Sequence, residues 1–99
     1  MNESYYTRTQ ILEILEIESD FLVALEREAV VNADAPRGVS GEYSARMLER
    51  VRVAHNLVHD LDVNLAGACI IVRMRERFVG QRLDLERALL ELERRHSNR

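Results

Sequence analysis

The sequence of 99 residues contains no lysine and no tryptophan, and it has one proline and one cysteine. A lone Cys69 excludes a disulfide within the chain and is typical of a reducing compartment. Arginine supplies every cation, which we attribute to GC-rich coding rather than to selection for bidentate contacts. The longest nearly unbroken apolar run, Leu65 to Val72, is far shorter than the ~20 residues that span a bilayer. With no signal-peptide pattern at its start, we expect a cytoplasmic protein.

Charge is distributed unevenly along the chain. Residues 1–35 carry a net charge of −6, residues 36–99 carry +3, and the total is −3. Affinity for duplex DNA depends on cations that meet its phosphates, about one charge per ~1.7 Å of axis. The acidic first third therefore argues against DNA as the ligand of this part of the chain.

Two short helices are predicted at the start. Thr7 and Gln10 have the spacing of a capping box, which predicts a first helix from about residue 6 to 17. In a second helix, a turn of about 100° per residue places four apolar side chains on one face: Phe21, Leu22, Leu25 and Ala29. The same geometry turns the following side chains outward: Asp20, Val23, Glu26 and Arg27.

The middle of the chain combines turn residues with a third helix. Val30 and Val31 predict a very short strand that leads into a wing-like loop at 32–41, rich in turn residues. Ser44 is the expected N-cap of a helix that runs to about Leu61. Its buried face is predicted to hold Met47, Leu48, Val51, Ala54, Leu57 and either Val58 or Leu61.

The last third predicts one long helix over about 64–96, roughly 50 Å long at 1.5 Å per residue. Apolar residues recur in it at the spacing of a coiled-coil seam: Ile71, Met74, Phe78, Leu85 and Leu92. A head of some 60 residues cannot cover such a stripe, so we expect a homodimer. The predicted fold is all-α, one structural domain with a head at 1–62 and a dimer arm at 63–99.

A family resemblance is carried by residues 48–67, above all Asp62-Val63-Asn64-Leu65-Ala66-Gly67 before a long apolar helix. This stretch resembles the third helix and linker of MerR-like winged helix-turn-helix proteins, and in particular the CbpM-type chaperone-modulator family. The resemblance extends from Tyr6 to about Arg95. It implies a MerR-like head and a partner, the J-domain of a DnaJ-like (CbpA-type) co-chaperone, which the family inhibits. Association with the nucleoid would then come through that partner.

Departures from the MerR pattern favour the modulator over a DNA reader. Where DNA readers show Arg-Tyr-Tyr-Glu-Arg, the chain has Val23-Ala24-Leu25-Glu26-Arg27, and Asp20 stands where an arginine is common. The turn that usually reads Gly-Val/Ile-Ser is here Glu16-Ile17-Glu18. If its first position needs a positive φ, glutamate costs roughly 1 kcal/mol there. Either the turn differs or the first helix runs longer.

We expect the partner to bind the outward face of the first two helices, because this face combines negative charge with apolar side chains. The expected contact residues are Glu16, Glu18, Asp20, Val23 and Glu26. A competing location is the third helix with the arm, around Arg50 and residues 73–77. The alternative function is a MerR-class DNA-binding regulator such as a heat-shock repressor, and a third is a plain dimerisation or scaffold module.

Other patterns are weaker. His55 and His59 have the spacing of a helical metal pair, but no second pair completes a site, so no metal is expected. We interpret Cys69 as a small core residue. The two arginine groups, at 46–52 and 73–77, are read as a solvated face with Arg73 and Arg77 flanking Glu76; the alternative is a nucleic-acid stripe. No nucleophile with a base and no phosphate loop is found, so neither an enzyme nor a cofactor is expected.

Overall fold

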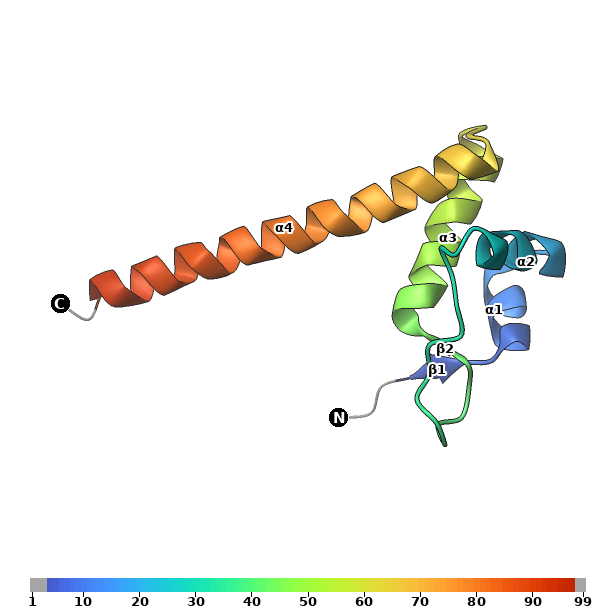
Figure 1. Cartoon of the computed structure of the whole chain (residues 1–99), viewed down its shortest axis with the longest axis horizontal. Helices are drawn as coiled ribbons and strands as arrows, with labels where there is room; N and C mark the ends of the chain where they lie inside the picture. The colour runs from blue at the N-terminus through green and yellow to red at the C-terminus, as the bar shows by residue number, and fades with distance from the viewer. Residues whose placement is uncertain (1–3, 98–99) are drawn as a thin grey trace.

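The computed structural model describes residues 4–97, in which a helical head continues into one long projecting helix (Figure 1). The elements in chain order are β1 (Tyr5–Tyr6), α1 (Arg8–Leu15), α2 (Ser19–Arg27), β2 (Tyr43–Ser44), α3 (Ala45–Asp60) and α4 (Leu65–Ser97). The longest extent of the molecule is 58 Å and the shortest is 20 Å. The prediction of a mostly helical chain that ends in a long helix is confirmed.

Three helices begin at side chains that satisfy free backbone N–H groups. Thr7 and Gln10 form the predicted capping box of α1, with both bonds present. The Ser44 hydroxyl accepts from the amide of Met47 at the start of α3, as predicted. At the start of α4, the side chain of Asn64 accepts a hydrogen bond of 2.7 Å from the amide of Gly67. These bonds span three residues, so local sequence determines where the helices begin.

The two strands pair where the sequence did not predict a sheet. β1 and β2 are antiparallel, with Tyr5 opposite Ser44 and Tyr6 opposite Tyr43. Gly41 lies just before β2 with φ +93°, and a Cβ there would lie 2.7 Å from the Tyr5 carbonyl carbon. Only glycine allows this close approach, so Gly41 sets the path by which the loop reaches β1.

The strand predicted at Val30 and Val31 is wrong. Ala29 takes a left-handed conformation with φ 58° and turns the chain back after α2. The Val30 amide then bonds to the Leu25 carbonyl at 3.1 Å, and both valines are buried without pairing to a strand. Ala29 itself is exposed beyond the end of α2, so its predicted place on the buried face is also wrong.

The core joins every helix of the head. Leu22 and Leu25 of α2 are fully buried, and α3 buries Met47, Val51 and Ala54, as predicted. Leu48, Leu57 and Val58 are only partly buried, and Leu61 is exposed because α3 ends at Asp60. The remaining buried side chains are Ile11, Val30, Val31, Tyr43, Ala68, Cys69 and Val72.

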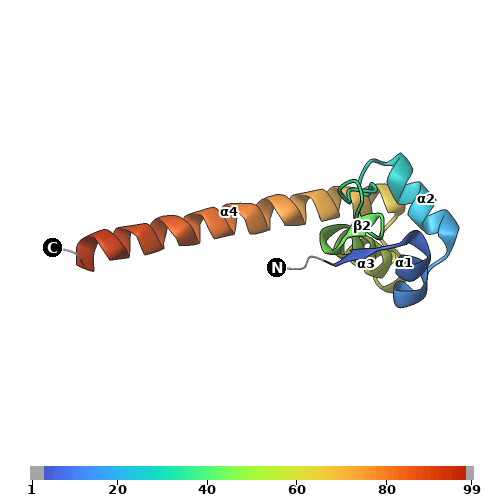
Figure 2. The same ribbon diagram turned by 90° about the horizontal axis from the view of Figure 1, so that it is seen from below.

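The first turns of α4 belong to the packing of the head. Ala68, Cys69 and Val72 are buried, whereas the helix beyond them projects past the head, as two perpendicular views show (Figures 1 and 2). Cys69 is thus a core residue, as expected, and burial raises the pKa of its thiol. In the part of the chain that the structure describes, no helix has the length and apolar character to cross a membrane.

Candidate protein-interaction surface

The corner between α1 and α2 has an unusual backbone. Glu16 ends α1 in the left-handed conformation, with φ 54° and ψ 49°. The next amide, of Ile17, bonds back to the Leu12 carbonyl at 3.1 Å, and Ile17 packs against the core. The turn therefore keeps the positive φ with glutamate in place of glycine, and α1 does not run longer. A non-glycine residue in this conformation costs roughly 1–2 kcal/mol.

Four carboxylates are exposed within eight residues of this corner: Glu13, Glu16, Glu18 and Asp20. Among the side chains that the structure describes, those of residues 4–95, none of them forms an ion pair. Glu13 and Glu16 lie at the C-terminal end of α1, where the helix dipole disfavours negative charge and where no basic residue compensates. These four residues form the acidic corner of the head. The charges of Glu13 and Glu16 and the left-handed backbone of Glu16 therefore lower the stability of the fold locally. Such unfavourable local features are common where a surface serves binding.

Glu26 does not belong to this surface, although the sequence places it there. Its carboxylate accepts hydrogen bonds from Arg8 at 2.7 Å and from the Tyr43 hydroxyl at 2.9 Å. Burial and this hydrogen bond raise the pKa of Tyr43, and the same carboxylate raises the pKa of Arg8. Glu26 thus links α1, α2 and β2, and its predicted outward orientation is wrong because partners distant in sequence satisfy it.

The apolar part of the surface also differs from the prediction. Val23 is only partly exposed, and so is Ala24. Ile14 is instead 54% exposed in the last turn of α1, next to Glu13. The sequence contained a signal for this: α1 carries four apolar residues at 11–15, more than one buried face of an eight-residue helix holds. Ile14 is the apolar residue that accompanies the acidic corner.

His55 and His59 stack on each other instead of converging on an ion. Their ring centroids are 4.2 Å apart, and Phe21 of α2 contacts both rings, at 5.5 and 5.8 Å. Burial lowers the pKa of His55, the neighbouring His59 lowers it further, and Asp60 opposes the shift. Among the side chains that the structure describes, those of residues 4–95, no cluster of three or more histidine, cysteine, aspartate or glutamate residues is placed to hold a metal ion.

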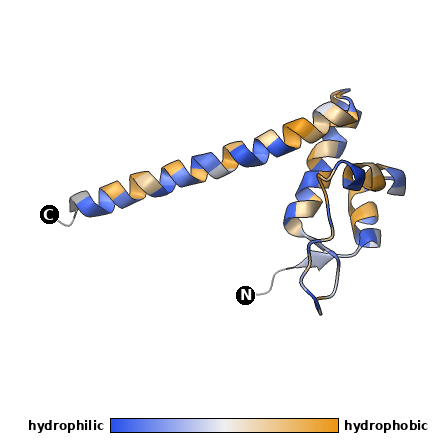
Figure 3. Ribbon diagram, in the orientation of Figure 1, coloured by the Kyte–Doolittle hydropathy of each residue, from blue (hydrophilic) through white to orange (hydrophobic). Residues whose placement is uncertain are grey.

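The arm exposes its apolar residues along much of its length, where hydrophobic and hydrophilic positions alternate (Figure 3). The five predicted seam residues are all exposed, from 39% for Ile71 to 67% for Phe78. Ile70 and Leu89 extend the same stripe. A series of this length on one helix exceeds the scattered apolar residues of an ordinary surface. The seam of the arm consists of Ile71, Met74, Phe78, Leu85 and Leu92.

Two arginines of the third helix, Arg46 and Arg50, are paired with the arm, whereas Arg52 pairs with Glu49 of its own helix. Glu76 accepts from Arg46 at 3.4 Å and from Arg50, and Arg50 also donates to the Val30 carbonyl. The prediction that Arg73 and Arg77 flank Glu76 is wrong, because Arg73 donates to the Glu28 carbonyl. The hydrogen bonds from Arg50 and Arg46 hold the pKa of Glu76 below its ordinary value. Arg46 and Arg50 are therefore structural contacts between α3 and α4, and Arg73 joins α4 to the end of α2.

Comparisons of the chain with protein-family models, with curated proteins and with solved structures each give no significant match.

Proposed function

We propose that this chain is a homodimeric, non-enzymatic modulator that binds the J-domain of a DnaJ-like, CbpA-type co-chaperone and restrains it by occlusion. The observation that carries the proposal is the acidic corner, four exposed carboxylates without an ion pair within the described residues. The corner offers a negative field and an exposed Ile14 to a basic helix of the partner. Complementary charge of this kind steers association and selects the partner.

The family resemblance of residues 48–67 supplies the identity of the partner, and the acidic corner supplies a surface that fits it. In this proposal α1, α2 and the loop before β2 form a MerR-like head that serves protein binding. The modulator acts in the cytoplasm as a dimer through the seam. The expected contact residues are Glu16, Glu18 and Asp20 with Ile14 at the apolar centre; Val23 lies at the margin.

The alternative of a DNA-binding regulator has less support from the cations of the head. Arg27 is the only cation of α2, and Arg8 of α1 is bound to Glu26 and Tyr43. The loop before β2 offers Arg37 alone. Because each phosphate contact contributes to affinity, so few free cations beside the acidic corner predict weak binding to duplex DNA.

The proposal is tested by NMR titration of the labelled full chain with a purified CbpA-type J-domain. Amide shifts should centre on residues 13–20. Reversal of Glu16 and Asp20 to arginine should slow association about tenfold at low salt and flatten its salt dependence, because charge steering acts on the on-rate. Replacing Ile14 by Asp should instead speed dissociation, because it removes apolar area from the centre of the contact.

A matched control reverses Glu42 and Asp84, which are also exposed and lie outside the corner. This variant has the same net charge as the corner variant and should associate within about twofold of the wild type. Shifts confined to α4 would refute the placement on the corner. Absence of binding at micromolar J-domain, with sub-micromolar and salt-steep binding to a promoter fragment, would favour the DNA-binding alternative.

A further inference from the structure

A second apolar line runs along α4, separate from the seam. Val72, Val79, Leu83 and Leu90 fall within about 40° of one another around a helix that turns about 100° per residue. Val72 is buried in the core of the head. Val79 and Leu83 continue this core-facing line beyond it and remain 44% and 49% exposed. The face of α4 that packs on the head is therefore longer than the head.

This line cannot be covered by the same partner helix as the seam. By the same helical geometry, its midline lies about 140° around α4 from that of the seam. A second copy of the arm that covers Phe78 and Leu85 would leave Val79 and Leu83 uncovered. The two apolar lines therefore require two different occupants.

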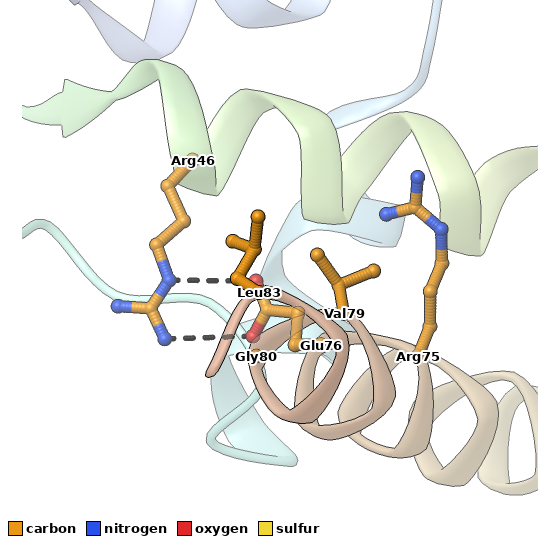
Figure 4. Close-up of a pocket in the computed structure, with 6 residues that line it drawn as sticks. All are labelled: Arg46, Arg75, Glu76, Val79, Gly80 and Leu83. Carbon is orange, nitrogen blue, oxygen red and sulfur yellow. Dashed lines mark hydrogen bonds and ion pairs between the residues drawn. The ribbon is translucent and has the colours of Figure 1, made fainter. Parts of the chain in front are cut away.

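Two residues of this line, Val79 and Leu83, form the floor of a groove at the first turn of α3 (Figure 4). The groove measures about 380 Å³ and is lined by Arg46, Arg75, Glu76, Val79, Gly80 and Leu83. In the close-up, the side chains of Val79 and Leu83 lie between those of Arg46 and Arg75. Gly80 also lines the groove, and a Cβ there would meet no atom within 4 Å, so a larger side chain at this position has room at the groove.

The charged side chains that line this groove are two arginines, Arg46 and Arg75, and one carboxylate, Glu76, which leaves an excess of one positive charge. Glu76 is shared by Arg46 and Arg50, and Glu49 is shared by Arg52 and Arg75, whose nitrogen lies 3.7 Å from it. Four guanidinium groups thus face two carboxylates. Arg46 and Arg75 keep 64% and 49% of their side-chain surface exposed. Their guanidinium groups can therefore donate hydrogen bonds to the carboxylates of a partner.

We propose that this groove is a docking site for an acidic segment of a partner protein, with a large apolar side chain between carboxylates. The apolar side chain would lie on Val79 and Leu83, and the carboxylates would bind Arg46 and Arg75. A nucleic acid fits less well, because the floor is apolar and the carboxylates of Glu49 and Glu76 repel phosphates. The site is independent of the acidic corner, which requires a basic partner.

The test starts from a display library of random twelve-residue peptides and selects those that bind the full-length protein. We expect enrichment of peptides with Leu, Ile or Phe flanked on both sides by Asp or Glu. The selected peptide, labelled with fluorescein, should bind the double variant Arg46→Glu/Arg75→Glu at least about tenfold more weakly. Gly80→Leu should give a similar loss, because the added side chain fills the groove while leucine is a better helix former than glycine.

The matched control is Arg37→Glu/Arg87→Glu, which makes the same change of net charge at exposed arginines outside the groove. It should retain affinity within about twofold. Basic or purely polar selected peptides, or equal binding by wild type and Gly80→Leu, would overturn the proposal. It would also be overturned if sedimentation showed a smaller assembly for Gly80→Leu, because a second copy would then fill the groove, or if duplex DNA displaced the peptide.

Discussion

Arg50 on α3 and Glu76 on α4 form the most buried of the ion pairs that join the arm to the head. Arg50 reaches Glu76 through two guanidinium nitrogens and also donates to the Val30 carbonyl. One side chain thereby joins α3, α4 and the buried segment after α2. The apolar packing of α4 ends near Val72, so this pair extends the contact by a further turn.

Replacing Glu76 by Gln should lower the free energy of unfolding by about 1–2 kcal/mol, because it leaves the largely buried guanidinium of Arg50 without its counter-charge. The folded-state pKa of Glu76 is depressed, so this stabilisation is present above the ordinary value of 4.5 and is lost as the pH falls below it. Urea unfolding of both proteins at equal concentration, at pH 7 and at pH 3.5, measures the difference. Glu86→Gln removes the exposed pair with Arg82 and should change stability by less than about 0.5 kcal/mol.

Replacing Glu16 by Gly should stabilise the protein by about 0.5–1 kcal/mol, because glycine adopts the left-handed conformation without the penalty of a side chain. The matched control, Glu13→Gly, places glycine inside α1 and should destabilise by a similar amount. Thermal and urea unfolding should give changes of opposite sign for the two variants. A destabilised Glu16→Gly protein would contradict the strain described for the corner.

The sequence predicted features that depend on neighbours in the chain and failed where distant residues decide. The caps at Thr7 and Ser44 act over three residues, so their side chains reveal them directly. Glu26 was placed on the surface because helical periodicity shows only which face of α2 is polar. Its partners lie eighteen residues before it and seventeen after it, at Arg8 and Tyr43. Periodicity holds no information on such contacts.

The same reasoning applies to the loop and to the arm. Val30 and Val31 have the composition of a strand, but the reversal at Ala29 and the hydrogen bond from Arg50 place them in the core instead. The length and start of α4 were predictable, because a long periodic pattern and Asn64 suffice. The groove between α3 and α4 was not predictable from the sequence. Arg46 lies thirty residues before Glu76, and only folding brings the two side chains together.

Acidification below the ordinary histidine pKa of 6.5 should destabilise the protein through the ring cluster of Phe21, His55 and His59. The folded-state pKa of His55 lies below its ordinary value of 6.5, so the unfolded chain binds the proton first and the folded state loses stability as the pH falls. Replacing His55 by Gln should flatten this part of the curve of unfolding free energy against pH. An unchanged slope in this variant would show that groups other than His55 cause the loss of stability on acidification. Carboxylates contribute to this slope chiefly below about pH 5.

The proposed dimer should dissociate when charge enters the seam. Asp at both Phe78 and Leu85 would place uncompensated carboxylates in an apolar contact, a cost of several kcal/mol that exposed positions do not incur. Sedimentation equilibrium at micromolar concentration should show a dimer for the wild type and a monomer for this variant. The control, Arg77→Asp/Arg87→Asp, adds negative charge to the same stretch of helix outside the five seam residues and should remain dimeric. A wild-type protein that sediments as a monomer at this concentration would contradict the proposed dimer.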